Sequence, residues 1–230
     1  MIHMNVSPAA KRLESDSDPI ASGTLEAVCV VHALRMDPGA VGITAIDKRP
    51  VDGAVKVRKM GLYADTQVDR EHHGGHDQAI YAYSAAEAAR WSDELGKPVP
   101  AGLFGENLRV VGIETTNAVV GERWKIGAHV VVEVTSPRIP CSTFARYLQE
   151  ENWVQRFTDR GDVGCFLKVI RTGKITAGDR IAVMSRPEHG VTVREIFVGP
   201  SREAAEALLE HARSTETEIP AKVLRTLPTL

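Results

Sequence analysis

Most of the chain between Thr24 and Ser185 consists of short strand-like segments separated by Gly, Pro and Asp. These segments either alternate apolar and polar residues or are apolar throughout, as in TLEAVCVVHAL, GAVKVRKMG, HDQAIYAYS, LRVVGI, HVVVEVT and GCFLKVIRTGKITAGDRIAVMS. A period of two is typical of a half-buried β-strand, and many short strands with turn signals between them indicate a sandwich or a barrel. We therefore predict a mainly β fold, a closed or nearly closed β-barrel with a few inserted helices.

Two segments inside the strand pattern have helical features. SAAEAARWSDEL places Ser84 before the helix and Glu87 at its third position, which is a capping box, and Leu95 followed by Gly96 ends it. The stretch STFARYLQEENWVQRFTDRG, residues 142–161, is the second predicted helical insertion.

The chain divides into three parts. Residues 1–22 are polar and aperiodic and are expected to form a flexible N-terminal arm, residues 23–186 the barrel domain, and residues 187–230 a small helical C-terminal extension. Thr192 and Glu195 have capping-box spacing at the start of the extension. We expect the extension to act as a docking or dimerisation element or as a lid over the barrel.

Composition narrows the functional classes. The 230 residues are 43% hydrophobic and carry a formal net charge of −2, so the sequence gives no electrostatic reason to expect a nucleic acid polymer or an anionic membrane as partner. No apolar run is long enough for a membrane span, and the N-terminus lacks the apolar core of a secretory signal. Three cysteines without CxxC spacing fit a reducing compartment, and we expect a cytoplasmic protein.

The nonapeptide SPRIPCSTF, residues 136–144, is the strongest chemical signal. It follows the apolar strand HVVVEVT and places Cys141 after two prolines and Arg138. The prolines restrict the backbone, and a nearby cation favours the thiolate, which is both a nucleophile and a soft metal ligand. The alternative is a buried cysteine that only packs. Cys29 and Cys165 lie inside apolar runs and are predicted to be core residues.

A histidine–glycine stretch, DREHHGGHDQAIYAY, spans residues 69–83. Two adjacent glycines permit positive φ and close approach of backbone N–H groups to a ligand. His72, His73 and His76 raise the possibility of zinc, but the glycines argue against the helix that would bring three imidazoles together. The alternative is a tight turn with solvent-exposed histidines.

Two further stretches contain polar residues at turns. LFGENL places Gly105, Glu106 and Asn107 before a strand, where Asn107 either binds a ligand or only stabilises its own turn. VRKMGLYADTQVD carries Arg58 and Lys59 before a glycine, and these charges either cover a solvated edge or belong to a site.

Taken in order, GLYADTQVD, HHGGHDQAIYAY, FGENL, SPRIPC and TGKITAGD resemble the motif series of the MOSC domain, the molybdenum cofactor sulfurase C-terminal-like family, and within it the free-standing bacterial YiiM-type group. The resemblance covers about Thr24 to Ser185. It implies a distorted β-barrel, like the barrel of pyruvate kinase, that binds a molybdenum cofactor (molybdopterin). Pyridoxal phosphate is not an expected ligand.

The resemblance also implies roles for individual residues. Cys141 is the expected molybdenum ligand and a catalytic residue. From side-chain chemistry rather than from the resemblance, either His73 or Glu106 is expected to relay protons, and the histidine has the more suitable ordinary pKa. The resemblance implies that the pterin pocket is lined by His73, Gly74, Gly75, Gly105, Glu106 and Asn107. Independently of the resemblance, we expect Arg138 to bind the cofactor, because a guanidinium can make two parallel hydrogen bonds to a phosphate or an oxo group, and we add the basic residues Arg58 and Lys59.

The implied activity is the reduction of small N-hydroxylated compounds, such as N-hydroxylated nucleobases, to amines. Because the chain has no flavin, haem or iron–sulfur motif, the electrons would come from a separate reductase. We expect a monomer or a homodimer. Two alternatives stay open: a carrier that holds sulfur or the cofactor on Cys141 without turnover, and a non-enzymatic binding module.

Three residues depart from the usual family pattern. Ala64 stands where glycine is common, and Gln78 and Thr143 stand where lysines are common. The last two changes remove positive charge from the predicted pocket.

Overall fold

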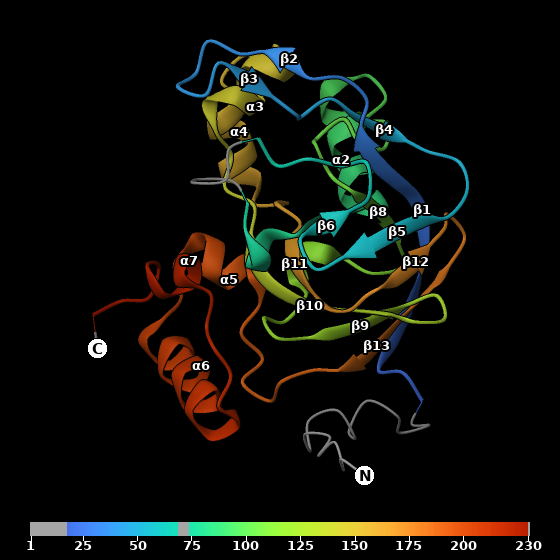
Figure 1. The fold of residues 1–230 in the computed structure, drawn as a ribbon. Helices are drawn as coiled ribbons and strands as arrows, with labels where there is room; N and C mark the ends of the chain where they lie inside the picture. The colour runs from blue at the N-terminus through green and yellow to red at the C-terminus, as the bar shows by residue number, and fades with distance from the viewer. Residues whose placement is uncertain (1–17, 69–73, 230) are drawn as a thin grey trace.

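The structure is a computed structural model, and it describes residues 18–68 and 74–229. Its centre is a closed barrel in which each strand pairs with the next in the order β1-β8-β7-β11-β10-β9-β13, and β13 pairs back with β1 (Figure 1). The barrel strands of the described residues are β1 (Ala21–Val31), β7 (Ile80–Ser84), β8 (Leu108–Val111), β9 (Arg123–Ile126), β10 (Val130–Pro137), β11 (Cys165–Arg171) and β13 (Arg180–Ser185). The prediction of a β-barrel with inserted helices is confirmed.

Shorter strands extend this barrel. β4 (Lys48–Pro50) pairs with β1, and a small sheet joins β5 (Val55–Arg58), β6 (Gly61–Leu62) and β12 (Gly173–Ile175). A third sheet is the hairpin of β2 (Arg35–Met36) and β3 (Ile43–Thr44). Within the described residues, the 3₁₀ turns η2 (His76–Gln78) and η3 (Thr115–Asn117) lie between strands.

Helix α2 (Ala85–Leu95) explains why β7 and β8 run parallel, since a parallel pair needs a crossover connection. Its predicted ends are confirmed. Ser84 accepts a hydrogen bond from the Ala86 N–H, Glu87 completes the capping box, and Gly96 ends the helix at φ 62°. The local sequence therefore determines both ends of this helix.

The stretch 142–161 forms two helices, α3 (Ser142–Leu148) and α4 (Trp153–Arg160). Gln149 and Asn152 have φ values of 57° and 51°, and these left-handed residues break the helix between them. The break returns α4 to α2, where the rings of Trp91 and Phe157 stack at a centroid distance of 5.7 Å. This aromatic packing anchors the segment that carries the SPRIPC turn.

The C-terminal extension contains α5 (Val193–Val198), α6 (Arg202–Thr215) and α7 (Ala221–Leu224). The predicted capping box of Thr192 and Glu195 is confirmed at the start of α5. α5 and α7 contact β10, and the three helices lie together on one side of the barrel (Figure 1). Of the N-terminal arm expected over residues 1–22, residues 1–17 lie outside the described part, and β1 already begins at Ala21.

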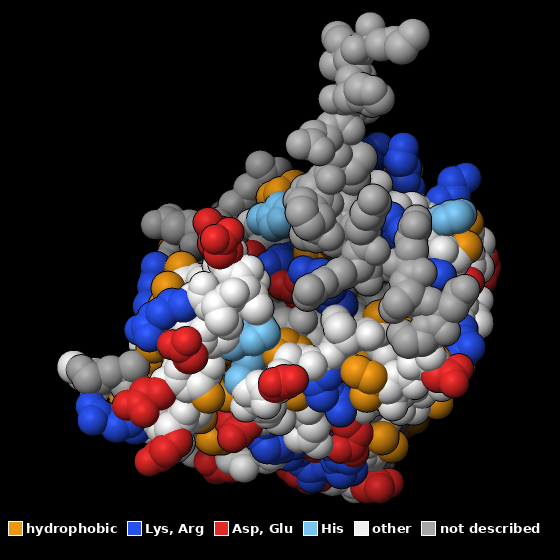
Figure 2. Space-filling model, turned by 90° about the horizontal axis from the view of Figure 1, so that it is seen from below, with side chains coloured by type: hydrophobic (Ala, Val, Ile, Leu, Met, Phe, Trp, Pro, Cys, Tyr) orange, Lys and Arg blue, Asp and Glu red, His pale blue; other side chains and the backbone are white. Residues whose placement is uncertain are grey.

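The described helices include none that is both long and apolar enough to cross a bilayer. On the face seen from below the barrel, acidic and basic side chains lie side by side rather than in one patch of a single sign (Figure 2).

Candidate functional site

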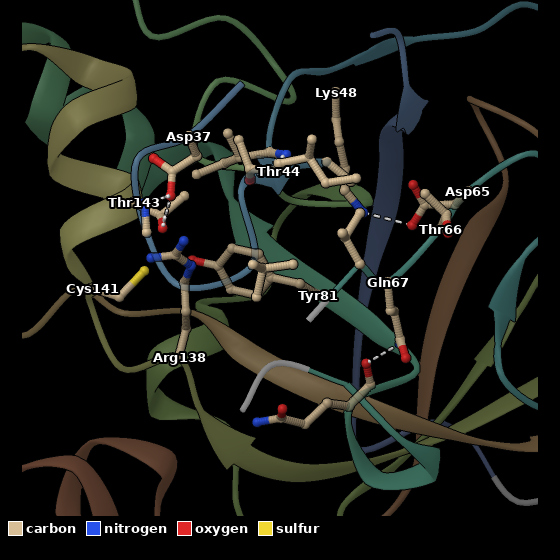
Figure 3. Close-up of a pocket in the computed structure, with 18 of the residues that line it drawn as sticks. Asp37, Thr44, Lys48, Asp65, Thr66, Gln67, Tyr81, Arg138, Cys141 and Thr143 are labelled. Atoms are coloured by element: carbon tan, nitrogen blue, oxygen red, sulfur yellow. Dashed lines mark hydrogen bonds and ion pairs between the residues drawn. The ribbon is translucent and has the colours of Figure 1, made fainter. Parts of the chain in front are cut away.

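A cavity of about 660 Å³ lies on the side of the barrel where β2, β3 and α3 are found. Its walls come from five stretches that are distant in the sequence: 37–48, 65–68, 78–81, 105–107 and 138–146, with Phe166 in addition. The polar residues in the wall are Asp37, Thr44, Lys48, Asp65, Thr66, Gln67, Gln78, Asn107, Arg138, Ser142, Thr143 and Arg146, together with Tyr81 and Cys141 (Figure 3).

The SPRIPC stretch forms the turn between β10 and α3. β10 ends at Pro137, and Cys141 is the extended residue, at φ −135°, that precedes the first turn of α3. Cys141 is half-buried and lines the cavity beside Arg138 (Figure 3). The predicted position of this thiol at a strand exit is confirmed.

The guanidinium of Arg138 is held by aromatic rings. Its central carbon lies 3.9 Å from the ring centroid of Phe144 and 5.5 Å from that of Tyr81. Its Nη1 is buried and has no hydrogen-bond partner among the described residues. A buried charged donor without an acceptor is costly, so the arrangement suits a bound oxyanion such as a phosphate or an oxo group.

The other two cations of the cavity wall are already paired. Lys48 Nζ lies 2.6 Å from Asp65 Oδ2, and Arg146 Nη2 lies 2.7 Å from Asp37 Oδ2. The hydrogen bond from Arg146 lowers the pKa of Asp37 to about 2, with further lowering by hydrogen bonds from Thr143 and the Gly39 N–H. Asp37 is therefore ionised at neutral pH and cannot serve as a proton donor there.

The FGEN turn contributes two of its predicted residues to the cavity. Asn107 donates from Nδ2 to Asp65 Oδ2 at 2.8 Å and accepts from the Tyr81 N–H at 3.1 Å. Gly105 has φ 78°, and an added Cβ would lie 3.0 Å from Ile46 Cγ1. The turn therefore needs a glycine at this position for both backbone and space.

Glu106 is fully buried outside the cavity wall. Its carboxylate accepts hydrogen bonds from the Gly102 and Phe104 N–H groups, at 2.8 and 3.0 Å, and pairs with Arg109. The predicted proton relay at Glu106 is not supported by this placement. The carboxylate stabilises the turn that positions Asn107 and does not reach the cavity.

The glycine loop, Gly74 and Gly75, is linked by hydrogen bonds to two glutamines of the cavity wall. The Gly74 N–H donates to Gln78 Oε1 at 3.1 Å, and the Gly75 N–H donates to Gln67 Oε1 at 3.0 Å. Gly75 has φ 90°, as predicted for a glycine turn. His73, for which proton relay and cofactor contact were predicted, lies outside the described residues.

Arg58 and Lys59 lie away from the cavity. The Arg58 guanidinium stacks on Tyr63, and Lys59 Nζ donates to the backbone oxygens of Val169 and Ile170, at 3.3 and 2.9 Å. Neither lines the cavity, so the prediction that they bind the cofactor is not supported. Both charged side chains instead make contacts at the edge of the barrel.

The three departures from the family pattern have distinct structural contexts. Ala64 takes the left-handed conformation, at φ 68°, where glycine would be free of strain. Thr143 donates to Asp37 Oδ2 at 3.0 Å, which links it to the pair with Arg146. Gln78 is buried and receives a hydrogen bond from Lys222, a contact that the sequence does not suggest.

The three thiols differ in accessibility. Cys29 and Cys165 are fully buried, as predicted, and burial raises the pKa of Cys29 to about 12 and that of Cys165 well above its usual value. Only Cys141 among them lines the cavity. In the described part of the chain, no group of three His, Cys, Asp or Glu residues could hold a metal ion by itself.

A second cavity, of about 900 Å³, lies between the barrel and the C-terminal extension. The rings of His189 and His211 meet there at a centroid distance of 5.0 Å. Burial lowers the pKa of His189, and the neighbouring His211 lowers it further.

The closed barrel therefore has a side cavity in which the Cys141 thiol lies beside Arg138, whose Nη1 has no hydrogen-bond partner among the described residues. The family model of the MOSC domain matches residues 69–182. The chain is 32% identical over 151 residues to the uncharacterized protein YflK of Bacillus subtilis, and 31% identical over 155 residues to protein YiiM of Escherichia coli. Both alignments cover 66% of this chain and 68% of the relative. This chain belongs to the MOSC domain family.

Two other kinds of similarity complete the comparison. A protein named reductase from Gibberella moniliformis is 31% identical over 164 residues, which are 68% of this chain and 29% of that relative. The crystal structure of YiiM from Geobacillus stearothermophilus matches with a TM-score of 0.68 at 24% identity and covers 90% of this chain and all of that one. YiiM from Escherichia coli matches with a TM-score of 0.59 at 22% identity, over 79% of this chain and 90% of that one. At these identities the structures show the shared fold.

Proposed function

We propose that this chain holds a molybdenum–pterin cofactor in the 660 Å³ cavity and reduces small N-hydroxylated compounds to amines with electrons from a separate reductase. The observation that supports this best is the buried, partnerless Nη1 of Arg138 beside the half-buried Cys141. One cavity thus contains a thiol, which is a soft metal ligand, and a guanidinium N–H group that can donate a hydrogen bond to an oxyanion. A molybdenum–pterin cofactor needs both kinds of group.

The residues that would hold the cofactor follow from their positions. Cys141 would bind the metal through Sγ, and Arg138 would hold a phosphate or an oxo group through Nη1. Asn107 and Gly105 would border the pterin at the FGEN turn. Gly74 and Gly75 donate hydrogen bonds to Gln78 and Gln67, which line the same cavity. When bound, the cofactor supplies a two-electron redox centre, which protein side chains do not provide.

The chain's own residues would position the substrate and exclude water. Val41, Ile43 and Ile46 form an apolar part of the cavity wall, and a planar base or small aromatic compound suits such a mixed surface. The reaction converts R–NHOH, two electrons and two protons into R–NH₂ and water. Asp37 is ionised and Glu106 is buried away from the cavity, so His73 stays the predicted proton donor among the residues proposed from the sequence.

The relatives give limited support for a redox function. One relative carries the name reductase, but this chain spans under a third of its length. The name therefore describes a longer protein, and a reductase activity of this chain is our proposal.

The test compares Cys141→Ala with Cys165→Ala in protein from a host that makes the cofactor. Cys165 is a matched control because it is a thiol at the start of β11 outside the cavity wall. We expect molybdenum and pterin fluorescence in the wild type and in C165A, loss of molybdenum in C141A, and reduction of a hydroxylaminopurine only where molybdenum is present. Equal molybdenum content in C141A and the wild type would refute the assignment of the metal ligand.

The same samples separate the alternatives. Pterin, or a labile mass increase of one sulfur atom on Cys141, without turnover in the presence of an electron donor would indicate a carrier. Absence of both metal and pterin from wild-type protein made with ample molybdate would indicate a binding module.

A further inference from the structure

The C-terminal helix α7 brings a lysine to the wall of the 660 Å³ cavity that contains Cys141. Lys222 Nζ donates to Gln78 Oε1 at 2.8 Å, across 144 positions of sequence. Gln78 is only 6% exposed and lines the cavity. The neighbouring Val223 is fully buried, which fixes α7 against the barrel and makes the position of Lys222 a defined one.

Gln78 is the junction between this lysine and the glycine loop. Its Oε1 accepts from both Lys222 Nζ and the Gly74 N–H. Its backbone oxygen accepts from Gln67 Nε2 at 2.8 Å, and Gln67 Oε1 accepts from the Gly75 N–H. Lys222 therefore belongs to a continuous set of hydrogen bonds that holds the backbone of both glycines.

The two donors also determine which end of the carboxamide stays available to a ligand. A lysine ammonium and a backbone N–H can only donate, so the atom that they share must be the oxygen of Gln78. The Nε2 end makes no hydrogen bond within the described part of the chain, and its two N–H bonds are available to a group in the cavity. A positive charge directly behind the amide strengthens such a donor.

We propose that Lys222 is a positioning residue of the cavity. It orients Gln78 so that Nε2 faces an oxyanion of the bound ligand, and it contributes positive charge behind that contact. Gln78 and Lys222, which come from two distant segments, thereby take the place of the lysine that is common at position 78 in the family. The identity of the oxyanion, a phosphate or oxo group of the cofactor, rests on the proposed function, whereas the orientation of Gln78 and the glycine loop does not.

The first test measures hydrogen exchange at the Gly74 and Gly75 amides in protein from a host that lacks the cofactor. Lys222→Met keeps the length of the side chain and removes the charge, and Lys222→Arg keeps the charge. Arg225→Met, an exposed position one turn further along the chain, is the matched control. We expect faster exchange at Gly74 in K222M, wild-type exchange in R225M, and at least partial rescue in K222R. Unchanged exchange in K222M would overturn the inference whatever the cofactor result.

The second test measures molybdenum and pterin retained after gel filtration of protein from a cofactor-making host. We expect K222M to retain the cofactor about tenfold more weakly than the wild type, as for the loss of one charge-assisted hydrogen bond. The double variant Gln78→Lys with Lys222→Gln returns the charge to position 78 and is expected to recover retention relative to K222Q. Wild-type retention in K222M, with faster exchange at Gly74, would overturn the role in ligand binding. Absence of cofactor from the wild type itself would count against the proposed function and leave the exchange result to decide on Lys222.

Discussion

Replacing Arg138 with methionine is expected to stabilise the cofactor-free protein while it abolishes cofactor binding. The substitution removes a buried Nη1 that has no partner in the described residues, and leaving such a donor unsatisfied costs about 1–3 kcal/mol. It also removes the cation–π contact with Phe144 at 3.9 Å, worth about 1 kcal/mol. Methionine can still pack on the ring.

The difference is a gain of about 1 kcal/mol in the free energy of unfolding, or a rise in Tm of about 2–4 °C for a chain of this size. Urea denaturation of protein from a cofactor-deficient host measures it. Arg109→Met is the control, because Arg109 is a buried arginine with a full set of partners: Glu106 and the backbone oxygens of Val99 and Pro100. Removing one partner of a buried ion pair costs about 3–5 kcal/mol. A loss of more than about 1 kcal/mol in R138M would refute the reasoning and make Arg138 a structural residue.

Two further predictions concern titrating groups. A maleimide is expected to label Cys141 in the native protein and to leave Cys29 and Cys165 unlabelled until denaturant is added, because burial raises the pKa of both thiols. Mass spectrometry of peptides identifies the labelled cysteines. Labelling of Cys165 in the native protein would contradict its burial in the barrel core. The lowered pKa of His189 means that the unfolded chain binds more protons near its ordinary pKa, so stability is expected to fall as pH drops through about 6.5, until the folded-state pKa is passed. His189→Gln should flatten the dependence of Tm on pH between about 7.5 and 5.5, and an unchanged slope would show that the titration of His189 is not the cause.

Features encoded by neighbouring residues were predictable from the sequence. The ends of α2 follow from Ser84, Glu87 and Gly96, which act through hydrogen bonds and backbone conformation within one helix. The SPRIPC turn was visible because an apolar strand, prolines and a cysteine adjoin in one stretch. In both cases the physical cause and its effect lie within a few residues.

Features that depend on distant partners were not predictable. Asp37 and Arg146 are 109 positions apart, and nothing near either residue indicates their ion pair. Glu106 resembles an accessible turn carboxylate until the fold places Arg109 and two N–H groups around it. Lys222 contacts Gln78 across 144 positions of sequence, and nothing near either residue indicates this hydrogen bond. Pairings of this kind are decided by tertiary packing, which local patterns do not record.

The pairing of β1 with β13 joins the first barrel strand to the last one, with Ala21 opposite Val183. During translation, the N-terminal strand must therefore wait for almost the entire domain to leave the ribosome before the circle of strands can close. The helix that carries Lys222 emerges later still. The nascent chain therefore contains the SPRIPC thiol well before the barrel and its cavity can form. Binding of any prosthetic group is expected to follow synthesis of the barrel and of α7.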